Sequence, residues 1–251
     1  MTNQKGGVGK TTTTINLAAA LSELEKKVLI IDLDPQGNAS TGLGVEVEDR
    51  ELSTYEFLVE GVPLEKVAME TEISGLSIVP ATIDLSSADI DLISNEKRSH
   101  LLHEALRKKQ ENKHKYDYIL IDCPPSLNIL TVNAMVASHS VLIPLQSEFF
   151  ALEGLSQLLL TVKEVRQTAN ENLRVEGIVL TMFDGRNNLS KQVEADARSN
   201  LRDLVFETII PRNVRVSEAP SYSMPVLTYD PSSKGSKAYM SLAKELLANN
   251  S

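Results

Sequence analysis

Short, nearly continuous apolar runs, separated by more polar stretches, dominate the hydrophobic pattern of this chain. The clearest runs extend from Val28 to Asp34 and from Tyr116 to Asp122, and both end in aspartate. Runs of this kind are typical of strands buried on both faces of a parallel sheet. We predict strands over residues 28–34, 76–80, 116–122, 141–145, 175–182 and 206–211.

Between these runs, apolar residues recur at helical spacing and predict helices over residues 12–25, 84–110, 151–170 and 234–248. Strands that alternate with helices predict an α/β fold, in which helices flank both faces of a mostly parallel, twisted sheet. No repeat, low-complexity linker or composition change divides the chain, so we expect a single domain over residues 1–251. Ligands of such folds bind beyond the carboxyl ends of the strands.

Composition narrows the functional classes. The net charge of −9 argues against a generally basic nucleic-acid binder, but residues 181–251 carry nine Lys and Arg against eight Asp and Glu. The single cysteine, Cys123, excludes a disulfide framework, a four-cysteine zinc site and an iron–sulfur ligand set within one chain. No segment resembles a signal peptide or reaches membrane-spanning length, so we expect a cytoplasmic protein without a membrane partner.

A glycine-rich loop near the N-terminus carries the most specific chemistry. Gly9-Lys10-Thr11 fits the end of the phosphate loop G-x-x-x-x-G-K-[ST], whereas Gln4 stands where the first glycine is expected. The loop instead offers Gly6 and Gly7, and adds a second lysine, Lys5. Its backbone N–H groups and the following helix N-terminus predict a phosphate cradle formed by Lys5, Gly6, Gly7, Val8, Gly9, Lys10, Thr11 and Thr12.

Only residues 1–4 precede this loop, although a phosphate loop normally follows a buried strand. Four residues are too few for such a strand, which is usually about five residues long. We therefore expect the first strand to be rudimentary, or missing because the start of the sequence has been assigned too late.

Acidic residues at two predicted strand ends complete a site for ATP and Mg²⁺. Thr11 and Asp122 are the expected magnesium ligands, with Asp122 acting through water, and we assign Asp32 to the same magnesium shell. Asp34, at the junction of strand and turn, is assigned to orienting the attacking water. Lys5, Lys10, Asp34 and Asp122 are therefore the expected catalytic residues.

Four separated motifs resemble one family: Asn3-Gln-Lys-Gly-Gly-Val-Gly-Lys-Thr-Thr12, Asp32-Leu-Asp-Pro-Gln-Gly-Asn38, Asp122-Cys-Pro-Pro-Ser126 and Pro211-Arg-Asn-Val-Arg-Val-Ser-Glu-Ala-Pro220. The first resembles the deviant Walker A loop of the ParA/MinD superfamily, and together they resemble chromosome-partitioning ATPases of the ParA/Soj type. The resemblance implies a P-loop fold and an ATP-bridged homodimer in which Lys5 reaches the partner's phosphates. It also implies non-specific binding to double-stranded nucleoid DNA, and slow hydrolysis stimulated by a ParB/Spo0J-like protein.

The same resemblance places adenine-side contacts at Pro211 and Asn213 and a DNA contact at Arg215. Non-specific DNA binding requires cations directed at phosphates. The C-terminal segment supplies further candidates: Arg186, Lys191, Arg198, Arg202, Arg212, Lys234 and Lys237. Of these we favour Arg186, Arg212 and Lys234.

Three alternative functions make different demands on the sequence. A MinD-like division-site-positioning ATPase requires a basic amphipathic C-terminal helix, whereas residues 241–251 contain one lysine and one glutamate. A nucleotide-gated binding module that scarcely hydrolyses ATP would not need Asp34. A metabolic ligase of the dethiobiotin-synthetase type would need a carboxylate substrate and would not respond to DNA.

Overall fold

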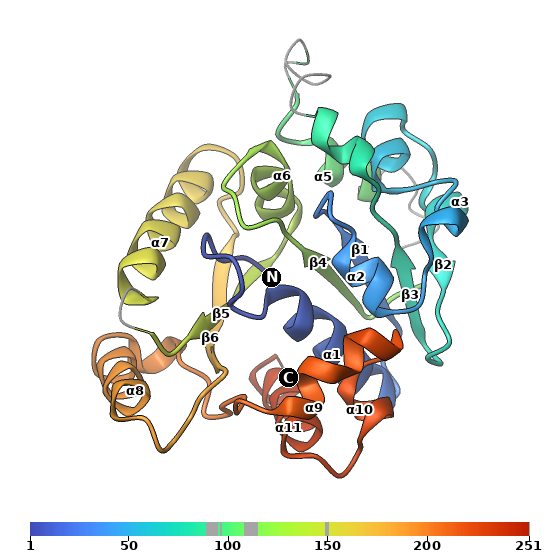
Figure 1. The fold of residues 1–251 in the computed structure, drawn as a ribbon. Helices are drawn as coiled ribbons and strands as arrows, with labels where there is room; N and C mark the ends of the chain where they lie inside the picture. The colour runs from blue at the N-terminus through green and yellow to red at the C-terminus, as the bar shows by residue number, and fades with distance from the viewer. Residues whose placement is uncertain (89–94, 96, 108–114, 149–150, 251) are drawn as a thin grey trace.

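The computed structural model describes residues 1–88, 95, 97–107, 115–148 and 151–250 (Figure 1). Its strands form a four-stranded sheet in the order β2-β3-β1-β4 and a two-stranded sheet, β5-β6. All pairs are parallel except β2 with β3. The strands are β1 Val28–Asp32, β2 Met69–Glu70, β3 Leu76–Val79, β4 Tyr118–Asp122, β5 Ser140–Gln146 and β6 Arg174–Thr181.

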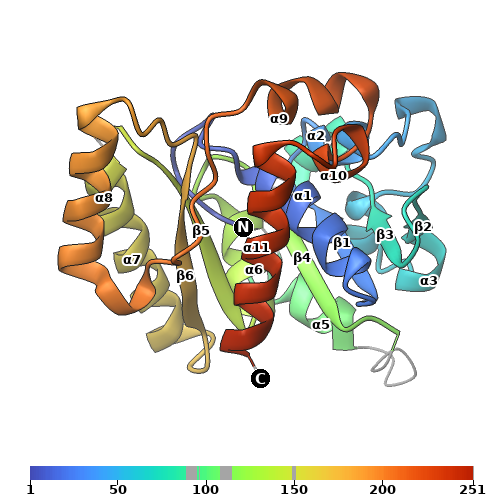
Figure 2. The same ribbon diagram turned by 90° about the horizontal axis from the view of Figure 1, so that it is seen from below.

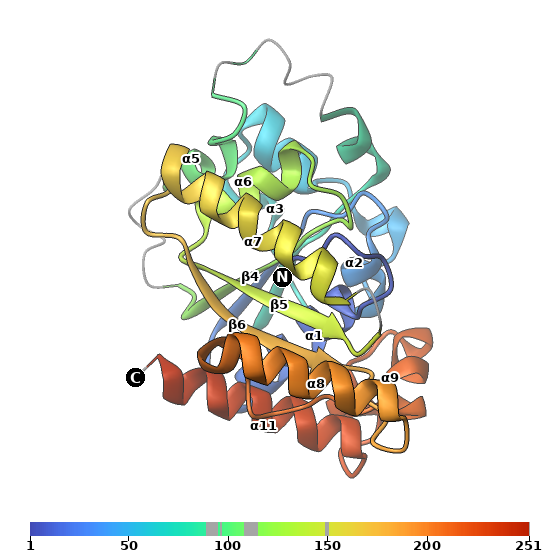
Figure 3. The same cartoon turned by 90° about the vertical axis from the view of Figure 1, so that its left-hand side faces the viewer.

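Helices cover both faces of these sheets, as expected. Figure 3 shows α5, α6 and α7 on one side and α8 and α11 on the other, and Figure 2 shows α11 running beside α1. The α-helices of the described chain are α1 Lys10–Glu23, α2 Asn38–Gly42, α3 Leu64–Val67, α5 Leu101–Arg107, α6 Ile129–Ala137, α7 Ala151–Thr168, α8 Asn188–Leu201, α9 Val214–Glu218, α10 Val226–Tyr229 and α11 Lys234–Asn249.

The alternating side chains of β1 explain this layering. Val28 and Ile30 belong to the core cluster that includes α1 and α11, whereas Leu29 and Ile31 belong to the cluster that includes α5 and α6. Successive side chains of a strand point to opposite faces, so a fully apolar strand needs a helical layer on each side. The continuous apolar run of the sequence is therefore accounted for by two separate cores.

The N-terminal residues lie between the two sheets. The Met1 amino group donates a hydrogen bond to the carbonyl of Ile121 in β4, at 2.6 Å, and the Thr2 N–H donates to Leu142 in β5, at 3.3 Å. Asn3 Nδ2 donates to the carbonyl of Pro144, at 2.7 Å. No strand precedes α1 in the described chain, yet these three residues contact both neighbouring strands.

Two predicted elements differ from the structure. Residues 206–211 form no strand: Pro211 pairs with Phe183 in one isolated bridge, and Val205, just before the segment, pairs with Ile178 of β6 in another. The N–H groups of Glu207 and Thr208 instead donate to the Glu245 carboxylate at 2.6 and 2.9 Å. The helix expected over residues 84–110 is interrupted. A 3-10 turn (Ile83–Ser87) and α5 are separated by a turn at residues 97–100, while residues 89–94, 96 and 108–110 lie outside the described residues.

Candidate nucleotide-binding and DNA-binding sites

The glycine-rich loop leads directly into the N-terminus of α1. Gly7 and Gly9 have φ values of +76° and +84°, which glycine adopts without the steric cost of a Cβ atom. Gly9 is the residue before α1, and its carbonyl accepts the Thr13 N–H at 2.8 Å. The helix thus begins at Lys10, two residues earlier than predicted, and its free N–H groups face the loop. This is the geometry of an anion-binding helix N-terminus.

Lys10 is buried at the base of the loop, with 7% of its surface exposed. Its Nζ donates a hydrogen bond to the carbonyl of Lys5, at 3.0 Å. Burial lowers the pKa of Lys10, while the carboxylates of Asp122 and Asp34 oppose that shift. The ammonium therefore lies inside the loop beside two acidic residues, as expected for a lysine that binds phosphate.

Asp122 meets α1 at the carboxyl end of β4. Thr11 Oγ1 donates to one carboxylate oxygen at 2.7 Å, and Thr14 Oγ1 donates to the other at 3.0 Å. Burial raises the pKa of Asp122, and these hydroxyl donors oppose the shift. The loop threonine and the strand-end carboxylate, predicted as magnesium ligands from separate motifs, are thus in contact.

The oxygen donors of Thr11 and Asp122 fit Mg²⁺, which prefers oxygen ligands and retains several waters. No group of three or more His, Cys, Asp or Glu is placed to hold a metal in the part of the chain that the structure describes. A bound Mg²⁺ would therefore depend on Thr11, Asp122, water and phosphate oxygens. It would supply charge neutralisation of the phosphates.

Asp32 ends β1 directly beside Asp122, its partner in the parallel register. Its Oδ2 accepts hydrogen bonds from Ser40 N at 2.9 Å and Ser40 Oγ at 2.7 Å, and its Oδ1 accepts from Asp34 N at 3.2 Å. Burial, with the charge of Asp122, raises the pKa of Asp32 to about 7. Asp32 therefore holds the following turn and α2 in place; its assignment to the magnesium shell stays a prediction.

Asp34 lies two residues beyond β1, in a turn closed by the bond from Gly37 N to its carbonyl at 2.8 Å. One carboxylate oxygen accepts Gln36 N at 3.0 Å, and the residue is 8% exposed. This carboxylate contributes to the charge around Lys10 and Asp122. The structure thus brings Asp34 to the same end of the sheet as the loop.

Lys5 extends away from its own loop. Its Nζ forms an ion pair with Glu148, just beyond β5, and both side chains are nearly half exposed. Gln146 Nε2 donates to the other Glu148 oxygen at 2.5 Å. The second lysine is therefore held by an acidic residue 143 positions away, a contact that the sequence motif does not indicate.

The remaining predicted nucleotide contacts lie at the loop and at the segment before α9. Val8 is buried, and its carbonyl accepts Thr181 Oγ1 at 2.8 Å, which joins the loop to β6. Thr12 lies in the first turn of α1. Pro211 pairs with Phe183 in an isolated bridge, and Asn213 caps α9. Their contact with adenine stays a prediction.

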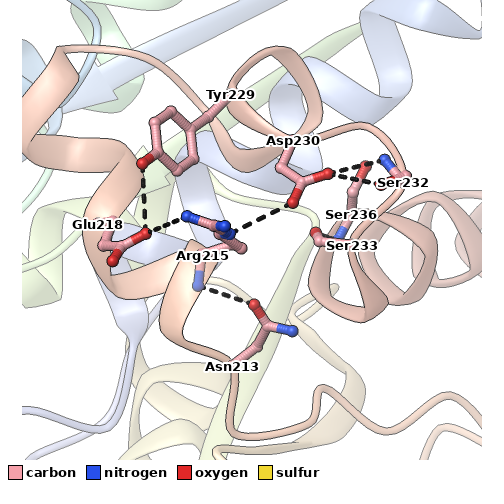
Figure 4. Close-up of polar contacts among 8 residues, drawn as sticks. All are labelled: Asn213, Arg215, Glu218, Tyr229, Asp230, Ser232, Ser233 and Ser236. Atoms are coloured by element: carbon pink, nitrogen blue, oxygen red, sulfur yellow. Dashed lines mark hydrogen bonds and ion pairs between the residues drawn. The ribbon is translucent and has the colours of Figure 1, made fainter.

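Arg215 does not extend freely into solvent (Figure 4). Its guanidinium pairs with Glu218 at 2.9 Å and with Asp230 at 3.4 Å. The backbone N–H of Arg215 donates to Asn213 Oδ1 at 2.9 Å. The Tyr229 hydroxyl donates to the same Glu218 oxygen at 3.2 Å. A phosphate at Arg215 would compete with two carboxylates.

The other cations divide into paired and unpaired groups. Arg186 is held by Asp184, and Arg198 by Glu194 and Glu207. Within the described ranges, no ion pair is formed by the exposed side chains of Lys191, Arg212, Lys234, Lys237 and Lys244. The side chain of Arg202 lies outside those described. Lys234, Lys237 and Lys244 recur every three or seven residues along α11, which places them on one side of that helix.

Sequence reasoning missed several residues that hold the site together. Thr14 was detectable, because it follows Thr11 by three positions and so shares its helix face. No local pattern marks Ser40 or Glu148, which reach the site through tertiary contacts with Asp32 and Lys5. The same holds for Arg50, whose guanidinium donates to Thr41 in α2.

No described helix is both long and apolar enough to cross a bilayer.

Comparison with known proteins identifies the family. The AAA domain family matches residues 1–175. The chain is 52% identical over 246 residues to the chromosome partitioning protein ParA of Caulobacter vibrioides, covering 98% of this chain and 92% of that protein. It is 51% identical over 249 residues to the sporulation initiation inhibitor protein Soj of Bacillus subtilis, covering 99% of this chain and 97% of that protein.

Solved structures show the same fold. Cobyrinic acid a,c-diamide synthase from Mycobacterium smegmatis, with bound ADP and magnesium, gives a TM-score of 0.84 at 36% identity, covering 98% of this chain and 91% of that one. The cell division ATPase MinD of Pyrococcus furiosus gives a TM-score of 0.81 at 27% identity, covering 99% of this chain and 97% of that one. Identity to the partitioning proteins is higher and nearly full-length. With its loop, its strand-end aspartates and these relatives, the chain belongs to the ParA/Soj family of chromosome-partitioning ATPases.

Proposed function

We propose that this chain, acting as one domain over residues 1–251, binds ATP and Mg²⁺ in the glycine-rich loop and hydrolyses ATP slowly. The observation that carries the proposal is the contact of Thr11 and Thr14 with Asp122, which joins the loop to the acidic strand end. Phosphoryl transfer to water needs mainly positioning and charge neutralisation. The named relatives and the solved structures with ADP and magnesium support the same chemistry.

The proposed steps assign one role to each residue. Loop N–H groups and Lys10 bind the phosphates, and Thr11 and Asp122 hold the magnesium shell together with Asp32. Asp34 accepts a hydrogen bond from the attacking water and directs it at the terminal phosphate. Because Lys10 and Asp34 are buried, bulk water is kept from the reacting groups, which strengthens each electrostatic contact.

Lys5 acts across a homodimer. In one protomer its ammonium is already directed away from the loop, toward Glu148 at the end of β5. An exposed ion pair of this kind contributes little stability, so a partner's triphosphate, which carries several negative charges, can replace Glu148. ATP then joins two protomers, and hydrolysis separates them.

The ATP-bound dimer binds double-stranded DNA without sequence preference, on the nucleoid in the cytoplasm. Arg212, Arg215 and Lys234 contribute, as does Arg186 after release from Asp184. The unpaired lysines of α11 support this proposal, because free cations bind phosphates without first losing an acidic partner. Two copies double the number of cations, which makes DNA binding depend on ATP. A ParB/Spo0J-like protein stimulates hydrolysis and so releases the dimer.

One assay tests the switch. DNA binding is measured against salt concentration with ADP and with a slowly hydrolysed ATP analogue, for the wild type, Lys5→Ala and Arg215→Glu. We expect binding only with the ATP analogue, a steep salt dependence, and loss in both variants. Lys163→Glu, the same charge change on α7, is the matched control and should bind normally. Binding that ignores the nucleotide contradicts the switch, and retained binding by Arg215→Glu removes Arg215 from the DNA-binding surface.

A second candidate, an amide-forming ligase, draws support from the 36% identity to the diamide synthase. Such an enzyme would hydrolyse ATP only with a carboxylate substrate, and DNA would not affect its turnover. Hydrolysis without any added carboxylate, stimulated by DNA together with a ParB-type partner, separates the two.

A further inference from the structure

A buried arginine outside the predicted motifs lies behind the turn that carries Asp34. Arg50 is 7% exposed, and its guanidinium is surrounded by acceptors. Nη2 donates to Thr41 Oγ1 at 2.8 Å and to the Val45 carbonyl at 2.7 Å; Nε donates to the same carbonyl at 3.2 Å. Nη1 donates to the Ala81 carbonyl at 3.0 Å. Arginine is rarely buried without such partners, so this placement is specific.

The guanidinium packs directly against the Asp34–Gly37 turn. Gly37 has a φ of +63°, and a Cβ atom there would lie 2.3 Å from Arg50 Nη1. The same glycine closes the turn through its N–H bond to the Asp34 carbonyl, and its carbonyl accepts Thr41 N at 3.0 Å. The turn is thus joined to α2 through Gly37, and the side of Gly37 on which a Cβ atom would lie rests against Arg50.

Arg50 also joins the segments that hold the two aspartates. Thr41 and Ser40 are neighbours in α2: Arg50 binds the first, while the second donates to Asp32 and accepts Ala81 N at 3.0 Å. Ala81, just beyond β3, is therefore bound to α2 twice, through Ser40 and through Arg50. None of these contacts touches the phosphate loop.

We propose that Arg50 is a positioning residue for ATP hydrolysis, which holds the Asp34–Gly37 turn so that the Asp34 carboxylate meets the attacking water. This inference rests on the proposed role of Asp34. A displacement of about 1 Å at a reacting group can cost about 100-fold in rate, whereas ATP binding by the loop needs no contact with Arg50. Loss of Arg50 should therefore lower kcat and leave KM for ATP nearly unchanged.

The test compares ATP turnover of full-length variants with DNA and a ParB-type partner present. Arg50→Met, which keeps the length of the side chain, should lower kcat about tenfold or more with KM for ATP within about twofold. Arg50→Lys restores the charge but cannot reach three acceptors, so it should recover only part of kcat. Thr41→Val should lower kcat by a smaller factor, and Thr41→Ser, which keeps the hydroxyl, should not.

Three comparisons separate positioning from general loss of structure. Asn133→Ala removes a buried side chain that donates to Arg98 and Ile129, so it should lower Tm without lowering kcat. On an Asp34→Ala background, Arg50→Met should have no further effect on kcat. If Arg50→Met does not fold, the comparison of kcat between Thr41→Val and Thr41→Ser tests the inference instead, because Thr41 lies at the exposed end of the hydrogen-bond network around Arg50.

Each outcome has one meaning. Wild-type turnover in Arg50→Met, or equal loss in Thr41→Val and Thr41→Ser, overturns this inference while the function of Asp34 stands. Wild-type turnover in Asp34→Ala overturns the proposed role of Asp34 itself. A further loss from Arg50→Met on the Asp34→Ala background shows that Arg50 acts elsewhere, and also overturns the inference.

Discussion

Thr14 supports Asp122 through its hydroxyl. The single hydroxyl proton is shared between two acceptors, the Lys10 carbonyl, one turn earlier in α1, and Asp122 Oδ1, each 3.0 Å from Thr14 Oγ1. Thr14→Val keeps the shape of the side chain and leaves one carboxylate oxygen without this donor. We expect a loss of about 1–3 kcal/mol in the free energy of unfolding, the usual cost of an unpaired buried polar group. Thr14→Ser keeps the hydroxyl and should lose much less in urea unfolding; equal loss in both contradicts the assignment.

Cys123 follows Asp122 and is the single cysteine of the chain. It is 2% exposed, and burial raises the pKa of its thiol to about 11. Because the thiolate is the reactive form, a raised pKa leaves less thiolate at pH 7–9 than an exposed cysteine has. We expect Ellman's reagent to leave the native protein unmodified at pH 8 and to modify one thiol after unfolding in urea. Rapid modification of the native protein would contradict this burial.

At the scale of elements, α1 and α11 link the nucleotide loop to the C-terminal segment. Thr13 Oγ1 and the Tyr239 hydroxyl lie 3.4 Å apart, and Asn16 Oδ1 accepts the N–H of Val226, the first residue of α10, at 2.7 Å. Leu242, fully buried in α11, belongs to the same core cluster as Ile15 and Leu21 of α1. The C-terminal helix is therefore part of the core behind the loop.

Leu242→Ala tests that packing. Removing the buried side chain should lower the free energy of unfolding by about 2–5 kcal/mol. Ser241→Ala, at the neighbouring exposed position, is the control and should change it by less than about 0.5 kcal/mol. Equal Tm values for Leu242→Ala and the wild type would show that α11 does not close this core.

The elements best predicted from sequence are those whose local pattern and tertiary role agree. Residues 28–34 were predicted as a strand because every position is apolar until Asp32, and β1 is indeed buried on both faces. Residues 206–211 contain three apolar residues, Phe206, Ile209 and Ile210, but form no strand, since Glu245 from α11 accepts two of the segment's backbone N–H groups. The short helix α2 was not predicted, because its stability comes from contacts with Asp32 and Arg50 rather than from helix propensity.

At the scale of the whole molecule, the candidate site was predictable where its residues form continuous motifs. The loop from Lys5 to Thr12 and the strand-end aspartates were found in this way, and the structure brings them together. The contacts of Lys5 with Glu148 and of Arg215 with Asp230 depend on how distant segments meet. Local sequence has no pattern for such pairs, and thus Glu148 and Asp230 were missed as acidic partners of these cations.

Arg215 should bind DNA more tightly when Glu218 is neutralised. Glu218→Gln removes one of two carboxylates that hold the guanidinium. We expect the affinity for DNA, measured with the ATP analogue, to rise about two- to fivefold, in keeping with the weakness of exposed ion pairs. On an Arg215→Ala background the same change should have no effect. An equal rise in both backgrounds would indicate a general charge effect.

In the proposed dimer, Asp34 of one protomer and Lys5 of its partner act on the same ATP. Mixing Lys5→Ala with Asp34→Ala tests this pairing, since each mixed dimer contains one site with both Asp34 and a partner's Lys5. ATP hydrolysis is measured for each variant alone and for the mixture, with DNA and a ParB-type partner present. We predict that both variants alone are nearly inactive and that the mixture recovers hydrolysis. A mixture no more active than the average of its two components would contradict this shared site.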